Sequence, residues 1–172
     1  MIQIIETERL IIREFNMHDI DSLSIILLDQ EVMKYSFRHI NSLNDIESYI
    51  ENCLNNYKKY GFGQWAVINK KNSQLIGICG LNSGFNDDNL LIHVNYRFAK
   101  TYWGLGFASE ALASIINYAQ VVKKIKILYA LVEPDNIKSA SIALNLGFQY
   151  QKETIYRGRK LVYYKKACKA NS

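Results

Sequence analysis

The stretch YWGLGFAS, residues 102–109, places two glycines two positions apart, between an aromatic run and the start of a helical pattern. The whole chain contains only nine glycines. Glycine adopts backbone conformations that other residues avoid, and it lets a ligand approach the main chain closely. A helix that begins near Gly106 would direct its unpaired N–H groups and its positive dipole end into this turn. The stretch therefore predicts a binding site for an anion such as a phosphate.

The segments that flank the turn differ in periodicity. In LLIHVNYRF (90–98), apolar and aromatic residues alternate with His93, Asn95 and Arg97, which predicts a half-buried strand in antiparallel pairing. Residues 107–122 carry apolar side chains at helical spacing. The segment ILYALV (127–132) is continuously apolar, as expected of a strand that is covered on both faces. The turn thus joins a strand to a long helix that a further strand follows.

The remaining elements predict the fold class. Further strands are expected at 9–14, 64–69, 75–81, 148–154 and 161–166, with a turn at 86–88 before the strand 90–98. Helices are expected after a cap at Asn16 or Asp19, at 44–60, and after Asn136. The resulting order is β-α-α-β-β-β-α-β-α-β-β, which is typical of an α/β protein with a mixed, largely antiparallel sheet.

Composition narrows the class of protein. A length of 172 residues fits a single domain over 1–172, and 49% hydrophobic with 22% charged residues is typical of a globular protein. No apolar run or signal-peptide pattern indicates a membrane partner, so we expect a cytoplasmic location. Three widely spaced cysteines predict neither a disulfide framework nor a metal site. The net charge of +5 comes largely from scattered lysine pairs, so nucleic acid is not an expected partner.

The glycine turn admits more than one phosphate ligand. Gly104, Gly106 and Ser109 form G-x-G-x-x-S between a strand and a helix, which approaches the dinucleotide-binding fingerprint. That fingerprint normally follows a buried first strand, however, whereas three predicted strands precede 90–98. A Walker-type loop is excluded because no Gly-Lys-Ser/Thr follows the turn. The remaining interpretation of the turn is a site in which main-chain amides at a helix N-terminus bind a pyrophosphate.

Four ordered segments carry a family resemblance. They are ETERLIIREF (6–15), LIGICGL (75–81), YRFAKTYWGLGFASEAL (96–112) and EPDNIKSASIALNLGF (133–148). Together they resemble the GNAT N-acetyltransferases, in particular the branch that includes the ribosomal-protein N-terminal acetyltransferases. The resemblance covers nearly the whole chain, and it implies a GNAT-type sheet with helices on both faces and acetyl-CoA as cosubstrate.

The resemblance also implies how coenzyme A is held. The strand before the turn would splay from its neighbour and pair with the pantetheine arm beside Phe98, Ala99 and Lys100. The pyrophosphate would rest on the main-chain N–H groups of Trp103, Gly104, Leu105, Gly106, Phe107 and Ala108. Asn136 would hydrogen-bond the pantetheine region, with Ser139 as a further contact. Two local interpretations stay open, since Ser109 either donates its hydroxyl to the coenzyme or favours a helix start, and Asn136 also suits an N-cap.

Two positions depart from the family pattern. A glutamate often lies three residues before the tyrosine of the strand, and here His93 stands in its place in His93-Val94-Asn95-Tyr96. His93 either accepts the proton of the amine or is a strand histidine on the solvent face. The oxyanion would be held by a main-chain N–H near Ala99. Many members use a tyrosine before the Gly-Phe pair to protonate the thiolate, and Ala143 occupies that place.

These features predict an N-acetyltransferase that transfers an acetyl group to a primary amine by direct attack on the thioester. The acceptor is a protein N-terminus or a small molecule, and residues 35–42 and 156–160 would border it. Because the glutamate and the tyrosine are both absent, a non-catalytic acyl-CoA-binding module is the alternative. The sequence leaves open whether the chain is a monomer or a homodimer.

Overall fold

The computed structural model describes residues 2–86 and 89–168. In this part of the chain one sheet has the strand order β1-β2-β3-β4-β5-β6-β8-β7. The strands are β1 (Gln3–Glu6), β2 (Leu10–Arg13), β3 (Gln64–Asn69), β4 (Gln74–Asn86), β5 (Asn89–Phe98), β6 (Ile127–Val132), β7 (Gln149–Tyr156) and β8 (Arg159–Ala167). The helices are α1 (Ile20–Leu27), α2 (Gln30–Met33), α3 (Leu43–Tyr60), α4 (Phe107–Val121) and α5 (Ile137–Asn145), with 3-10 turns at Met17–Asp19 and Lys100–Tyr102.

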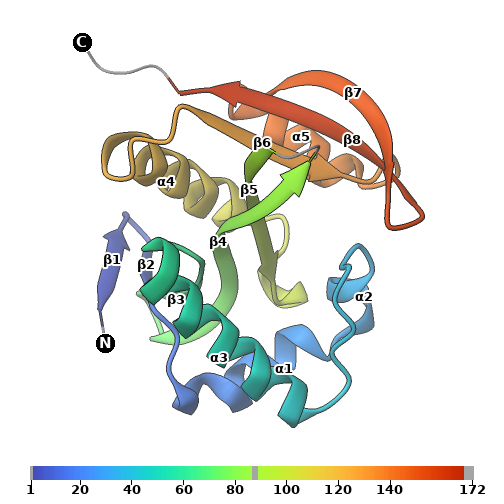
Figure 1. Cartoon of the computed structure of the whole chain (residues 1–172). Coiled ribbons are helices and arrows are strands. Elements are labelled where there is room, and N and C mark those ends of the chain that lie inside the picture. The colour runs from blue at the N-terminus through green and yellow to red at the C-terminus, as the bar shows by residue number, and fades with distance from the viewer. Residues whose placement is uncertain (1, 87–88, 169–172) are drawn as a thin grey trace.

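Helices pack on both faces of the sheet. Trp65 and Val67 of β3 belong to a core that α4 covers, whereas Ala66 and Ile68 belong to a second core that α1 and α3 cover. This division follows from the strand period of two, which sends alternate side chains to opposite faces. Figure 1 shows α1, α2 and α3 grouped together and apart from α4 and α5. The predicted α/β fold with helices on both faces is confirmed.

The helix predicted at 44–60 is α3, and both of its ends are capped. The Ser42 side chain accepts a hydrogen bond from Asp45 N–H at 3.2 Å at the N-terminus. At the C-terminus, Gly61 is left-handed with φ of 68°. Lys58 and Lys59 lie in the last turn, where cations stabilise the negative end of the helix dipole. These ends fix α3 along one side of the pocket described below.

The sheet opens between β5 and β6. These two strands run parallel, and their ladder contains the single pair His93–Tyr129, whereas every other neighbouring pair of strands is antiparallel. Beyond His93, the C-terminal half of β5 therefore has no ladder partner on its β6 side among the described residues. The mixed sheet and the splayed strand that the resemblance implies are both present.

Several predicted elements differ in detail. Strand β1 and helix α2 were not predicted, because each is four residues long and therefore too short to show a clear period. The strand predicted at 75–81 extends through residue 86, and the predicted turn at 86–88 lies partly outside the described residues. The prediction that 127–132 is covered on both faces is wrong in part, because Ile127 is 39% exposed and the burial of β6 alternates. In residues 2–86 and 89–168, no helix is long and apolar enough to cross a membrane.

Candidate active site

The glycine turn has the backbone conformation that its sequence predicts. Gly104 and Gly106 are both left-handed, with φ of 75° and 81°. L-residues avoid this conformation, which explains glycine at both positions. No side chain caps α4 at its N-terminus, and a backbone bond runs from Glu110 N–H to Gly106 C=O at 3.1 Å. The amides of residues 107–109 precede that bond and point out of the helix end.

The surroundings of the turn fit a diphosphate. A Cβ atom added to Gly104 would meet no atom within 4 Å, so the space in front of this residue is open. Lys138 Nζ of α5 lies 5.5 Å from the centroid of the Trp103 ring, and Trp103 Nε1 donates to Phe98 C=O at 2.7 Å. Outward amides, a nearby ammonium group and open space together provide what an anion requires.

Polar contacts that support the start of α4 from behind the turn were not predicted from the sequence. Glu110 accepts hydrogen bonds from Thr7 Oγ1 at 2.6 Å and from Arg9 N–H at 3.0 Å, and it forms an ion pair with Arg9 Nε at 2.6 Å. Arg9 also donates to Leu105 C=O at 2.9 Å, and its guanidinium lies 4.4 Å from the centroid of the Phe107 ring. The signal was present in the sequence, because ETERL and GLGFASEAL both belong to the segments that resemble the family. These contacts tie the helix start to the β1–β2 connection.

The main chain at the end of β5 corrects one expectation. Ala99 N–H donates to Ile76 C=O of β4 at 3.0 Å, so it is not free to hold an oxyanion. Phe98 and Gly77 face each other in the β4–β5 ladder, and the Ala99–Ile76 bond makes them a non-hydrogen-bonded pair. The Phe98 N–H therefore points away from β4, toward β6. Phe98 rather than Ala99 provides a free amide here.

The remaining predicted coenzyme contacts lie around this strand end. Asn136 Oδ1 caps α5 by accepting from Ser139 N–H at 3.3 Å, so the capping interpretation is confirmed. Ser139 Oγ in turn accepts from Tyr96 Oη at 2.9 Å, which joins α5 to β5. Lys100 Nζ forms an exposed ion pair with Glu31 of α2 at 2.8 Å. Lys100 is thus engaged away from the glycine turn.

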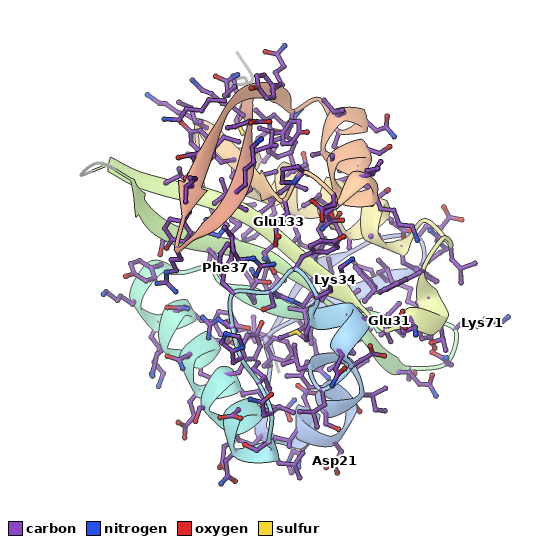
Figure 2. The ribbon with its side chains drawn as sticks, turned by 90° about the vertical axis from the view of Figure 1, so that its right-hand side faces the viewer. Asp21, Glu31, Lys34, Phe37, Lys71 and Glu133 are labelled. Carbon is purple, nitrogen blue, oxygen red and sulfur yellow. The ribbon has the colours of Figure 1, made fainter. Side chains whose placement is uncertain are left out.

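A pocket of about 470 Å³ lies on the other face of β5. We call it the acceptor pocket. It is lined by side chains of β5, α3 and β4, by residues 35, 37 and 38 of the loop after α2, and by residues 156–157; the β5 side chains include Leu91, His93, Asn95 and Arg97. The two segments that were predicted to border the acceptor meet here, with the Phe37 and Tyr156 rings 5.6 Å apart. Figure 2 shows Phe37, Lys34 and Glu133 gathered where the loop after α2 approaches the β7–β8 hairpin.

His93 is not a solvent-facing strand histidine. Its side chain lines the acceptor pocket, and its Nδ1 atom is buried with no hydrogen-bond partner among the described residues. Burial lowers the pKa of His93 from 6.5 to about 4, and the Leu91 backbone only partly opposes this shift. The imidazole is therefore neutral at pH 7, so one of its two ring nitrogens is without a proton. Among the described residues, no group of three His, Cys, Asp or Glu side chains could hold a metal ion.

The sequence is similar to that of known acetyltransferases. Residues 9–149 match the Acetyltransferase (GNAT) domain family. The uncharacterized N-acetyltransferase p20 of Bacillus licheniformis is 31% identical over 146 residues, which cover 83% of this chain and 80% of that protein. The matched residues include the glycine turn and the whole of β5.

Two solved structures show the same fold. RimL, a ribosomal L7/L12 alpha-N-protein acetyltransferase in complex with coenzyme A, has a TM-score of 0.84 at 13% identity and covers 99% of this chain and 100% of its own. The microcin C7 self-immunity acetyltransferase MccE, in complex with acetyl-CoA and AMP, has a TM-score of 0.76 at 18% identity and covers 94% of this chain and 93% of its own. With the family match over most of the sequence, the chain belongs to the GNAT family and is an N-acetyltransferase that uses acetyl-CoA.

Proposed function

We propose that this enzyme transfers the acetyl group of acetyl-CoA directly to a primary amine bound in the acceptor pocket. The observation that carries the proposal is the position of β5 between two sites. The open amides of the glycine turn and the free Phe98 amide lie at its C-terminal end, and the acceptor pocket lies along its His93 face. One strand thus supports both the thioester and the amine, as direct transfer requires.

His93 and Phe98 have complementary parts in this reaction. Acetyl-CoA supplies an acetyl thioester, whose carbonyl carbon bonds to the amine nitrogen while its C–S bond breaks. The neutral His93 imidazole accepts the proton that the amine loses, directly or through water. The Phe98 N–H donates to the carbonyl oxygen as negative charge develops there. Because the pKa of His93 lies near about 4, His93 accepts this proton during attack and does not deprotonate a free ammonium group.

Tyr96 takes over the task of the tyrosine that is absent before the Gly-Phe pair. Ala143 fills that position on α5 and is buried. Tyr96 Oη reaches the same helix one turn earlier, where it donates to Ser139 Oγ at 2.9 Å. Burial raises the pKa of Tyr96 to about 12, so the hydroxyl keeps its proton, and rotation of this O–H away from Ser139 Oγ lets it donate a hydrogen bond to the leaving thiolate instead.

The test is an acceptor screen with acetyl-CoA, in which coenzyme A release is measured and each product is identified by mass spectrometry. The panel contains small amines and peptides with free amino termini. The expected result is a product that is one acetyl group heavier and is modified at nitrogen. Tight acetyl-CoA binding without acetylation of any amine would instead support the acyl-CoA-binding module. Size-exclusion chromatography with light scattering separates monomer from homodimer.

A further inference from the structure

The arginines of this chain fall into two groups. Three of the six form ion pairs with carboxylates, and they are Arg9, Arg13 and Arg159. The other three form no ion pair among the described residues, and all of them line the acceptor pocket: Arg38, Arg97 and Arg157. No aspartate or glutamate is among the described residues that line this pocket. The pocket wall therefore carries positive charge that the described part of the chain does not neutralise.

Arg97 is the most deeply placed of these three. The alternation of β5 puts it on the same face as His93, and burial lowers the pKa of its guanidinium. Arg97 donates to Asn95 Oδ1 at 2.8 Å and to Ser36 Oγ at 3.0 Å, and both acceptors are uncharged. A half-buried guanidinium without a counterion is partly desolvated, and its fixed orientation suits a carboxylate or a phosphate.

Arg38 adds a second charge from the loop after α2. Its guanidinium lies 5.3 Å from the centroid of the Tyr49 ring, and its charge is one of the causes that lower the pKa of Arg97. Arg38 is exposed, so it borders the mouth of the pocket, whereas Arg97 lies further inside. Two like charges held on the same pocket repel each other, and an anion between them would relieve that repulsion.

The pocket also contains polar atoms that have no partner. Gln64 Oε1 is buried and, like His93 Nδ1, forms no hydrogen bond among the described residues. Tyr49 and Gln64 are only 4% and 5% exposed, and both line the pocket. The carbonyl oxygen of Gln64 can only accept, so it suits an N–H group. Buried polar atoms are normally satisfied, which favours a ligand that brings a hydrogen-bond donor to this wall.

We propose that the acceptor is a small primary amine that also carries a carboxylate or a phosphate. Arg97, assisted by Arg38, binds the anion, and Gln64 and His93 accept hydrogen bonds from the amine. A cavity of about 470 Å³ accommodates a ligand of this size. A polyamine is disfavoured, because its charges repel the three arginines. This proposal rests on the proposed function and specifies its substrate class.

Matched amine pairs test the proposal. Tyrosine is compared with tyramine for the carboxylate, and phosphoethanolamine with ethanolamine for the phosphate, with spermidine as the polycation. Binding to the coenzyme A-loaded enzyme is measured by calorimetry, and turnover is measured by coenzyme A release. We expect the anionic member of at least one pair to bind at least about tenfold more tightly and to have the higher kcat/KM. The pair that responds identifies the anion.

Variants locate the effect. Arg97→Gln should abolish the preference for the anionic amine, mainly through a higher KM for that amine than for its neutral partner, whereas Arg97→Lys should retain part of the preference. Arg38→Gln changes an exposed side chain, so it should reduce the preference without loss of folding. Equal binding of both members of each pair, or preferred binding of spermidine or of a neutral peptide, overturns the proposal. A binding preference without turnover upholds the pocket assignment and contradicts the proposed function instead.

Discussion

Replacing Gly104 by alanine should separate the cost of a strained turn from the loss of coenzyme binding. Gly104 and Gly158 have nearly the same φ, 75° and 76°, and a Cβ at either position meets nothing within 4 Å. Gly104 lies in the glycine turn, whereas Gly158 lies between β7 and β8. An L-residue in this conformation costs roughly 1–2 kcal/mol. Both variants should therefore lose about 2–8 °C in Tm for a domain of this size.

Only the Gly104→Ala variant should bind acetyl-CoA more weakly. If its turn relaxes to avoid the strain, at least one amide no longer points at the pyrophosphate. A hydrogen bond to a charged group contributes about 1.5–3 kcal/mol, which corresponds to a rise in Kd of about 10- to 150-fold. Calorimetric titration with acetyl-CoA gives the Kd, and scanning calorimetry gives the Tm. An unchanged Kd for Gly104→Ala, with both Tm values lowered, would refute the assignment of the anion site; an unchanged Tm would refute the strain argument.

The site leads to four further predictions. Because burial lowers the pKa of His93 to about 4, kcat/KM of the wild type should decrease as the pH falls through that value rather than through 6.5. His93→Gln should remove this decrease at acid pH and lower kcat/KM about 100-fold. A decrease of the wild-type kcat/KM near pH 6.5 would contradict the burial argument. The same folded pKa lies below the unfolded one, so urea titrations should show stability falling as the pH drops from 6.5 toward about 4, and less so in His93→Gln. Burial raises the pKa of Glu110, but hydrogen bonds from Thr7 and Arg9 outweigh this effect and lower the pKa. Glu110→Gln should therefore lower the free energy of unfolding by about 1 kcal/mol at pH 7, and by nothing once the pH is below that pKa. Equal stability of the two proteins at pH 7 would show that these contacts of Glu110 are dispensable. Tyr96→Phe should lower kcat about tenfold with the Kd for acetyl-CoA unchanged, and an unaffected kcat would mean that water alone assists the thiolate.

The strongest local patterns in the sequence predicted the corresponding elements well. The glycine turn, the ends of α3 and the start of α4 depend on backbone conformation and on hydrogen bonds within a few residues, so their signals lie in short segments. The short elements β1 and α2 gave no such signal. They are stabilised by their neighbours, β1 by pairing with β2 and α2 by contact with α1.

The Ala99 amide shows where local reasoning fails. Whether an N–H of a strand is free depends on its register with the neighbouring strand, and register is set by side-chain packing over the whole sheet. If β5 were shifted by one residue against β4, the amide of Ala99 would be free and the amide of Phe98 would be hydrogen-bonded. The family resemblance placed the donor near this position, but it could not choose between adjacent residues.

The sequence by itself determined the order of most elements and the left-handed conformation of the two glycines in the turn. It also determined that the N-terminus of α4 suits a pyrophosphate, and which residues of β5 share a face. All of these follow from periodicity and backbone sterics within one segment. Only the tertiary structure decided that His93 is half-buried and neutral, and that Arg38, Arg97 and Arg157 meet in one pocket without a described carboxylate. These residues come from separate parts of the chain, and burial and charge pairing depend on which segments the folded sheet brings together.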